Sequence, residues 1–181
     1  AIFQTREFEE RFLKIGMGYR IIGGIKFYER AEIKDAVSYL RIINQKFDDL
    51  ALERVIGVPK RGIGESTINQ LYKFANENKT CLEDSIIKLL ELNKLKPKIK
   101  TSLSQLINLI HKWRVDSKNK KHFDLLKIVL DESGYSEMLK NKKDIENENR
   151  LENLKELLRA MQDYENLQSF LEHVALATSI D

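Results

Sequence analysis

Residues 58–67, VPKRGIGEST, bring together the side chains and backbone that could bind a phosphate. The two glycines allow unusual backbone angles and let a ligand approach the main chain closely. The helix expected to follow begins with N–H groups that have no internal partner, and such groups suit an anion. Two cations and two hydroxyls add further donors. We therefore predict a phosphate-binding loop made of Lys60, Arg61, Gly62, Ile63, Gly64, Ser66 and Thr67.

The same stretch is also compatible with an ordinary tight turn before a helix. That alternative accounts for Pro59, for one of the glycines and for Ser66 as a helix-capping residue. It does not require two cations directly before the glycines. If the loop does bind phosphate, it would grip a nucleic-acid backbone without reading its sequence.

A second basic stretch lies upstream, in residues 23–35, GGIKFYERAEIKD. Lys26, Arg30 and Lys34 recur every four residues, which would place them on one face wherever the segment is helical. Phe27 and Tyr28 could stack on the bases of a single strand. For two adjacent aromatic residues leading into an amphipathic helix, burial of at least one in the core is the expected alternative.

Charge is unevenly distributed, although the net charge of +3 is small. Residues 94–121 hold nine Lys or Arg against one acid, whereas residues 131–172 hold eleven acids against six bases. Such a separation indicates a polyanionic partner on one side of the molecule. A solvated basic helix surface is the alternative that the same pattern allows.

The sequence offers little catalytic or metal-binding chemistry. It lacks the glycine-rich G-x-x-x-x-G-K-[ST] loop that cradles nucleotide phosphates, and its three histidines lie far apart. Cys81 is the only cysteine, and we expect it to be a structural thiol. The acidic pairs at 48–49 and 131–132 fall at predicted helix ends, where capping explains them. We therefore predict no catalytic residue and no metal site in this chain.

Composition favours a helical domain inside the cell. The chain is 42% hydrophobic and 33% charged with two prolines, which is too apolar for a disordered protein. No run of about 18 apolar residues could span a membrane. The single cysteine agrees with a reducing compartment. A start at Ala1 without a methionine indicates a fragment of a longer protein.

Apolar spacing predicts an all-α fold with a short extended segment near the N-terminus. The extended segment is residues 19–22, ended by Gly23 and Gly24. Thr80 has the spacing of a capping box at the start of one helix, and Pro97 marks the start of another. The expected helices cover residues 29–45, 48–56, 65–78, 80–92, 97 onward, 123–130, 145–164 as the longest, and 167–177.

Three blocks of the sequence closely resemble the UvrD/PcrA/Rep-type superfamily 1 DNA helicases. They are MGYRIIGGIKFYERAEIKDAVSYLRII, DDLALERVIGVPKRGIGESTI and NRLENLKELL, in the order in which the family has them. The resemblance implies a 2B-like helical subdomain over residues 19–181, preceded by the last helix of the 2A motor domain in residues 1–18. Residues 93–141 resemble the family only loosely, and Gly18 stands where many members have proline.

The resemblance also implies roles for particular residues. Residues 60–64, Thr67 and Lys34 would contact duplex DNA at a junction with single strands. Asp48 and Asp49 match an acidic position that bears on the open and closed orientations of the subdomain. ATP and Mg²⁺ would bind to motor domains outside this chain, in a cytoplasmic, nucleoid-associated 3′–5′ helicase.

A different function is also open at this point. The chain could be a protein-interaction or autoinhibitory module, which docks repair proteins or packs on its own motor domains.

Overall fold

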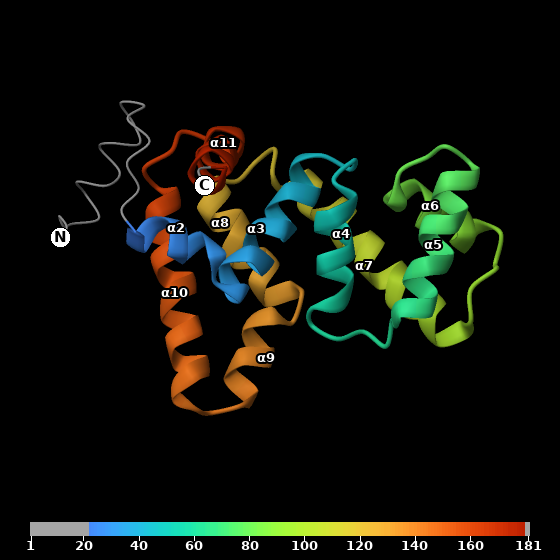
Figure 1. Ribbon diagram of the computed structural model, residues 1–181, viewed down its shortest axis with the longest axis horizontal. Helices are drawn as coiled ribbons and strands as arrows, with labels where there is room; N and C mark the ends of the chain where they lie inside the picture. Colours follow the sequence, from blue (N-terminus) through green and yellow to red (C-terminus); the bar gives the residue numbers. More distant parts are fainter. Residues whose placement is uncertain (1–21, 180–181) are drawn as a thin grey trace.

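The computed structural model describes residues 22–179, and its regular secondary structure over this range is entirely α-helical (Figure 1). The all-α prediction is therefore confirmed. The helices are α2 (Ile22–Glu29), α3 (Ala31–Asn44), α4 (Asp49–Gly57), α5 (Glu65–Glu77), α6 (Leu82–Glu91), α7 (Pro97–Asp116), α8 (His122–Glu132), α9 (Tyr135–Asn141), α10 (Ile145–Met161) and α11 (Leu167–Thr178).

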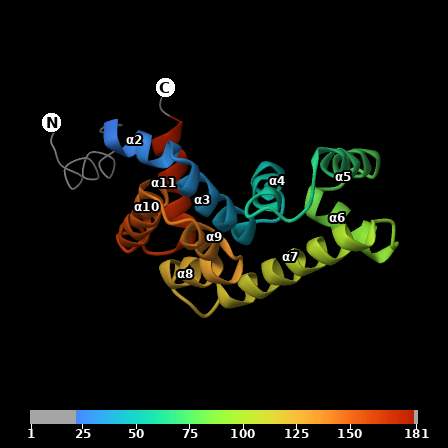
Figure 2. The same cartoon turned by 90° about the horizontal axis from the view of Figure 1, so that it is seen from below.

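Helix α3 is the central element of the fold. It packs against α2, α4, α7, α8, α10 and α11. The α5–α6 pair lies at one end of the long axis, and the group of α2, α10 and α11 lies at the other (Figures 1 and 2). Helix α7 runs lengthwise between these ends and contacts α6, α3 and α8.

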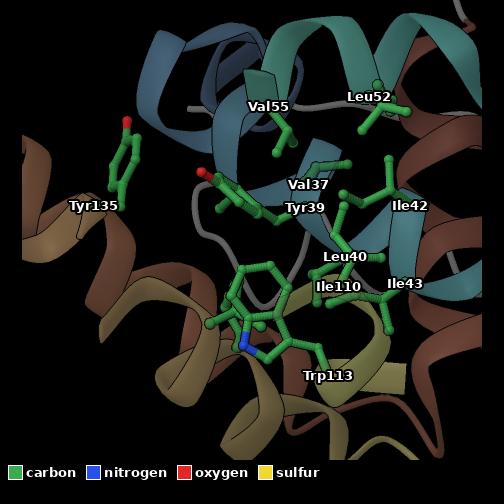
Figure 3. Packing of buried hydrophobic residues seen from close by; sticks show 14 of the residues in the cluster. Val37, Tyr39, Leu40, Ile42, Ile43, Leu52, Val55, Ile110, Trp113 and Tyr135 are labelled. Atoms are coloured by element: carbon green, nitrogen blue, oxygen red, sulfur yellow. The ribbon is translucent and has the colours of Figure 1, made fainter. Parts of the chain in front are cut away.

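The core is built around the middle of α3 (Figure 3). Tyr39, Leu40 and Ile42 are buried there, and the Tyr39 ring meets Trp113 of α7 edge to face, with ring centroids 5.7 Å apart. The sequence predicts one apolar face on this helix. Instead α3 is surrounded on nearly all sides, because so many other helices pack on it, and even Glu32 and Asp35 are buried.

Most helix boundaries lie at the helix-capping and helix-breaking residues from which the sequence predicts them. Asp48 caps α4, Pro97 occupies the first turn of α7, and the break at Ser133 and Gly134 separates α8 from α9. Gly134 has a φ of 83°, in the left-handed region that favours glycine.

Two details of the helix prediction are wrong. Helix α7, with 20 residues, is longer than α10, with 17. Thr80 does not form a capping box, because α6 begins after Cys81 and makes no side-chain cap of its own there. The Leu82 N–H instead donates to Asp49 Oδ1 at 3.0 Å, so a carboxylate from α4 caps α6.

The predicted extended segment lies mostly outside the described residues, as does the predicted 2A remnant at residues 1–18. Ile22 is described, and it begins α2. The prediction that Gly23 and Gly24 end a strand is wrong, because both lie inside that helix. Glycine in a helix costs about 1 kcal/mol relative to alanine, and the packing of α2 on α3 and α11 offsets this cost. None of the described helices is both long and apolar enough to cross a bilayer.

A buried ion pair fastens α6 to α7. The Arg114 guanidinium donates to both carboxylate oxygens of Glu83, at 2.7 and 2.5 Å, and Glu83 is 2% exposed. Arg114 Nη2 also donates to the Ile42 carbonyl at 2.7 Å, which adds α3 to the same junction. A paired buried carboxylate is tolerated, whereas an unpaired one is costly.

We expect Arg114→Met to lower the free energy of unfolding by about 3 kcal/mol, because it leaves the Glu83 carboxylate buried without its main partner. Lys112→Met is the matched control, since its half-exposed ammonium pairs with Asp116 and Glu132 at the surface. That variant should lose less than about 1 kcal/mol. Urea unfolding followed by circular dichroism measures both. Equal losses would contradict a structural role for the buried pair.

Candidate nucleic-acid interface

The α4–α5 loop, residues 58–64, connects the end of α4 to the start of α5. Gly62 has a φ of 76°, so the turn itself requires glycine at this position. Gly64 is the N-cap of α5 with φ −98° and ψ −176°, an extended conformation that any residue adopts. A Cβ added at Gly64 would meet nothing within 4 Å. The fold therefore requires glycine at the first of these positions and not at the second.

The main-chain N–H groups of residues 62–67 are unpaired within residues 22–179. The α5 N-terminus has no side-chain cap, and the Gly64 carbonyl accepts the first helical bond, from the Ile68 N–H at 3.1 Å. No acceptor among residues 22–179 pairs with the N–H groups of residues 62–67. Free N–H groups at a helix N-terminus, next to an exposed glycine, form a surface suited to an anion.

The two cations of the loop have different roles. The Lys60 side chain is exposed and has no hydrogen-bond or ion-pair partner in residues 22–179. Arg61 is half-buried, and its Nη2 donates to the Tyr39 hydroxyl at 2.5 Å while its Nε lies 3.4 Å from the Val55 carbonyl. Lys60 thus faces solvent whereas Arg61 is held against the fold, and contact of either residue with DNA stays a prediction.

Arg61 is an anchor for the loop. Its carbonyl accepts a hydrogen bond from Ser102 Oγ of α7 at 2.9 Å. The Tyr39 hydroxyl accepts the hydrogen bond from the Arg61 guanidinium and donates its own proton to the Val58 carbonyl at 2.6 Å. Polar side chains from two other helices thus hold the carbonyls of the loop on the inner side. Sequence reasoning missed Tyr39 and Ser102, because nothing in their local pattern links them to a loop 22 and 41 residues away.

The other residues predicted to bind phosphate also differ in their exposure to solvent. Ser66 is exposed, as predicted for a phosphate donor. Thr67 is only 6% exposed, and its contact with a ligand stays a prediction. Ile63 is half-buried, and its side chain packs against the core, so its backbone is the part it offers to a ligand.

The upstream basic stretch does not form one continuous helical face. Arg30 has φ −66° and ψ 142°, an extended conformation that interrupts the helix between α2 and α3. Lys26 and Lys34 therefore lie on different helices. Tyr28 is buried and meets Phe27 edge to face, so core packing is the correct alternative to base stacking.

Lys34 is exposed near the start of α3, and its contact with DNA stays a prediction. It lines a hollow of about 460 Å³ between α2, α3, α4 and α11, together with Arg41 and Arg54. No residue of the loop lines that hollow.

Asp48 and Asp49 both cap helices. Asp48 Oδ1 accepts from the Ala51 N–H of its own helix at 3.1 Å, and Asp49 Oδ1 accepts from Leu82 of α6 as described above. These bonds account for the two carboxylates structurally, and their regulatory role stays a prediction.

The described residues show no cluster of three His, Cys, Asp or Glu side chains that could hold a metal ion. Burial raises the pKa of the Cys81 thiol, which disfavours the reactive thiolate. His122 is buried, with its Nε2 2.5 Å from the Met161 carbonyl. These side chains therefore contribute to packing, and the α4–α5 loop is the better candidate for a site.

Comparison with known proteins places these features in a family context. The family model for the UvrD-like helicase C-terminal domain matches residues 3–181. A probable DNA helicase II homolog of Rickettsia felis is 41% identical over 97% of the chain, and DNA helicase II of Rickettsia typhi shows the same identity and coverage. The ATP-dependent DNA helicase PcrA of Staphylococcus aureus is 36% identical over 98% of the chain. The chain spans only about a quarter of the length of these relatives, 25 to 27%.

We expect Arg61→Ala to lower the free energy of unfolding by about 1–3 kcal/mol, because it leaves the buried Tyr39 hydroxyl without its charged partner. Lys60→Ala, one residue away, should change it by less than about 0.5 kcal/mol, since an exposed side chain without partners is lost. Urea titration of both variants measures the difference. Two equally stable variants would show that Arg61 does not anchor the loop.

The Tyr39 phenol gives a pH test of the same anchor. Burial raises its pKa to about 12, which outweighs the lowering effect of the Arg61 charge. A pKa that is higher in the folded than in the unfolded state contributes stability that is present below about pH 10 and lost as the pH rises toward 12. We expect Tyr39→Phe to flatten the fall in unfolding free energy between these pH values. Curves that stay parallel for wild type and variant would contradict the burial of the phenol.

Proposed function

The chain belongs to the UvrD-like helicase family, and from this premise we propose that it is the part of a DNA helicase that grips duplex DNA through the α4–α5 loop. The observation that carries the proposal is the set of unpaired N–H groups over residues 62–67, beside the exposed side chains of Lys60 and Ser66. A DNA phosphate would accept hydrogen bonds from these groups and a charge contact from Lys60.

Binding of this type would be independent of base sequence. Backbone amides, a lysine and a serine hydroxyl contact phosphate oxygens, which are the same in every nucleotide. Gly64 would contribute by leaving the loop backbone open to the approach of a phosphate. A helicase must hold whatever duplex lies ahead of it, so a grip that ignores sequence suits this work.

We further propose that the chain is the 2B subdomain of a 3′–5′ enzyme and that it holds the duplex at a junction with single strands. ATP and Mg²⁺ would bind to motor domains in other parts of the longer protein, as the name ATP-dependent DNA helicase of the PcrA relative supports. Asp48 and Asp49, at the turn between α3 and α4, would bear on the orientation of the subdomain. The whole protein would then work in the cytoplasm, on nucleoid DNA and alongside repair proteins.

A second candidate function is docking onto another protein surface through the same α3–α4 turn. Phe47 is 66% exposed and Leu50 is 78% exposed, and such side chains favour contact with an apolar partner. The partner would be the helicase's own motor domains or a repair protein. Salt separates the two functions, because phosphate contacts weaken steeply with salt and apolar contacts do not.

We expect Gly64→Ala to weaken duplex binding several-fold without lowering the melting temperature. Its methyl group has open space in the fold, and it would narrow the approach of a phosphate to the loop backbone. The matched control is Gly57→Ala at the end of α4, where an added Cβ also has nothing within 4 Å. Fluorescence anisotropy with a labelled duplex measures affinity.

The wild-type chain should lose affinity with salt at a slope of about −3 to −4 in log–log form if four phosphates are contacted. Two unrelated duplex sequences should bind equally. Wild-type affinity in Gly64→Ala, or a strong preference for one sequence, would count against contact between the loop backbone and phosphate.

A further inference from the structure

A hollow of about 430 Å³ opens where the α7–α8 turn meets the start of α11. Three cations of the turn, Lys118, Lys120 and Lys121, line it. They are three of the nine cations in the basic segment of residues 94–121. Their side chains are exposed, so the packing of the core does not account for them, and duplex binding by the α4–α5 loop does not use them.

The three lysines of this turn have no acidic partner of their own. None of them makes an ion pair within residues 22–179. Two nearby acids are already engaged, because Asp116 pairs with Lys112 at 2.7 Å and Asp124 pairs with Lys127 at 3.8 Å. Glu165 is the acid that lines the hollow, so three lysines against one carboxylate leave a charge of +2 around it. A concave surface with uncompensated positive charge favours an anionic ligand.

This hollow lies far from the α4–α5 loop. Ser102 contacts the loop, and the part of α7 from Ser102 to its end at Asp116 is about 21 Å long at 1.5 Å per residue. Figure 2 shows the α7–α8 turn at the end of α7 that points away from α6. Exposed charges are largely screened beyond about 8–10 Å at physiological ionic strength. The hollow is therefore electrostatically independent of the loop and has a ligand of its own.

The lining of the hollow favours an acidic protein segment over a nucleic acid. Among the described residues no Phe, Tyr, Trp or Arg lines it, and the ring of His122 is buried. It thus offers no exposed ring for base stacking and no guanidinium fork for phosphate. Leu167 adds an apolar side chain to the lining, and Val115, 58% exposed, lies three residues before Lys118. Lysines beside exposed apolar side chains suit carboxylates interspersed with apolar groups.

We propose that this hollow is a docking site for an acidic segment of another protein, one that carries an apolar side chain among its carboxylates. The carboxylates would pair with Lys118, Lys120 and Lys121, and the apolar side chain would lie against Leu167. Helix α8 begins beside these lysines without a side-chain cap, so its positive end would add to the attraction. The inference goes beyond duplex binding by the loop and does not rest on it.

The test is the binding of a fluorescein-labelled peptide, in which pairs of glutamates alternate with single leucines, to the 181-residue chain. Anisotropy measures the affinity. We expect Lys118→Ala, Lys120→Ala and Lys121→Ala each to weaken binding about two- to fivefold, and the triple variant about tenfold or more, from the range for one exposed ion pair. Lys98→Ala is the matched control, because it removes an exposed lysine from the opposite end of α7 and should match wild type.

Glu165 provides a variant of the opposite sign. Glu165→Gln removes the carboxylate that lines the hollow, and we expect it to tighten peptide binding about twofold. A peptide with glutamine in place of glutamate should not bind, and one with serine in place of leucine should bind more weakly. Melting temperatures should be unchanged in all these variants, because the side chains are exposed.

Titration with DNA separates this docking site from the proposed duplex grip. A saturating unlabelled duplex should leave the peptide affinity unchanged, and the triple lysine variant should bind duplex as wild type does. If duplex or a single-stranded oligonucleotide displaces the peptide, or the triple variant loses duplex affinity, the hollow belongs to a nucleic-acid surface and the inference fails.

Two further results would overturn the docking site whatever the loop binds. One is equal weakening of peptide binding by Lys98→Ala and Lys120→Ala, which would show attraction by general charge. The other is the absence of peptide binding to the folded chain. The grip of the α4–α5 loop is tested by duplex affinity in Gly64→Ala, so the failure of one proposal is distinguishable from the failure of the other.

Discussion

The arrangement of the candidate site depends on how Arg61 is held. Its guanidinium donates a hydrogen bond to the Tyr39 hydroxyl, and its carbonyl accepts one from the Ser102 hydroxyl. Both the side chain and the backbone of Arg61 are therefore fixed to other helices. Tyr39 can serve this purpose because it lies at the centre of α3, packed against Trp113 and fully buried. With the Val58 and Arg61 carbonyls bonded on the inner side, the N–H groups of the following residues are left for a ligand. The proposed phosphate surface would thus be positioned at the boundary of the core by residues that do not contact the phosphate themselves.

Electrostatics in this chain depend on partners more than on the count of charges. The sequence shows nine cations and one acid over residues 94–121. In the fold, acids from α6 and α8 reach into this segment and neutralise its middle, through Glu83 and Glu132. Seven of the nine cations have no ion-pair partner within residues 22–179, and they lie near the two ends of α7. Screening by salt makes each of these places electrostatically independent.

Much of the fold could be predicted from local signals, and much of the site could not. Pro97, Asp48 and Gly134 act through their own backbone or the next turn, so their effects are readable in the sequence. Thr67 differs, because whether its hydroxyl is exposed depends on what packs over the first turn of α5. The role of Arg61 is set by partners on α3 and α7, and no pattern of local residues records such long-range contacts. The loop's position was predictable, while the division of its residues into anchors and ligand-facing groups was not.

The carboxylate of Asp49 has an effect that reaches beyond the helix it caps. It joins the beginning of α4 to the beginning of α6, and the Tyr72 hydroxyl joins α5 to Glu53 of α4 at 2.7 Å. The two segments that flank the loop are therefore tied together directly, as well as through the loop. If the loop binds a duplex as proposed, these two contacts would share the load with the loop and pass it to α3, which packs on α4, so that α4 and α5 would not separate under it.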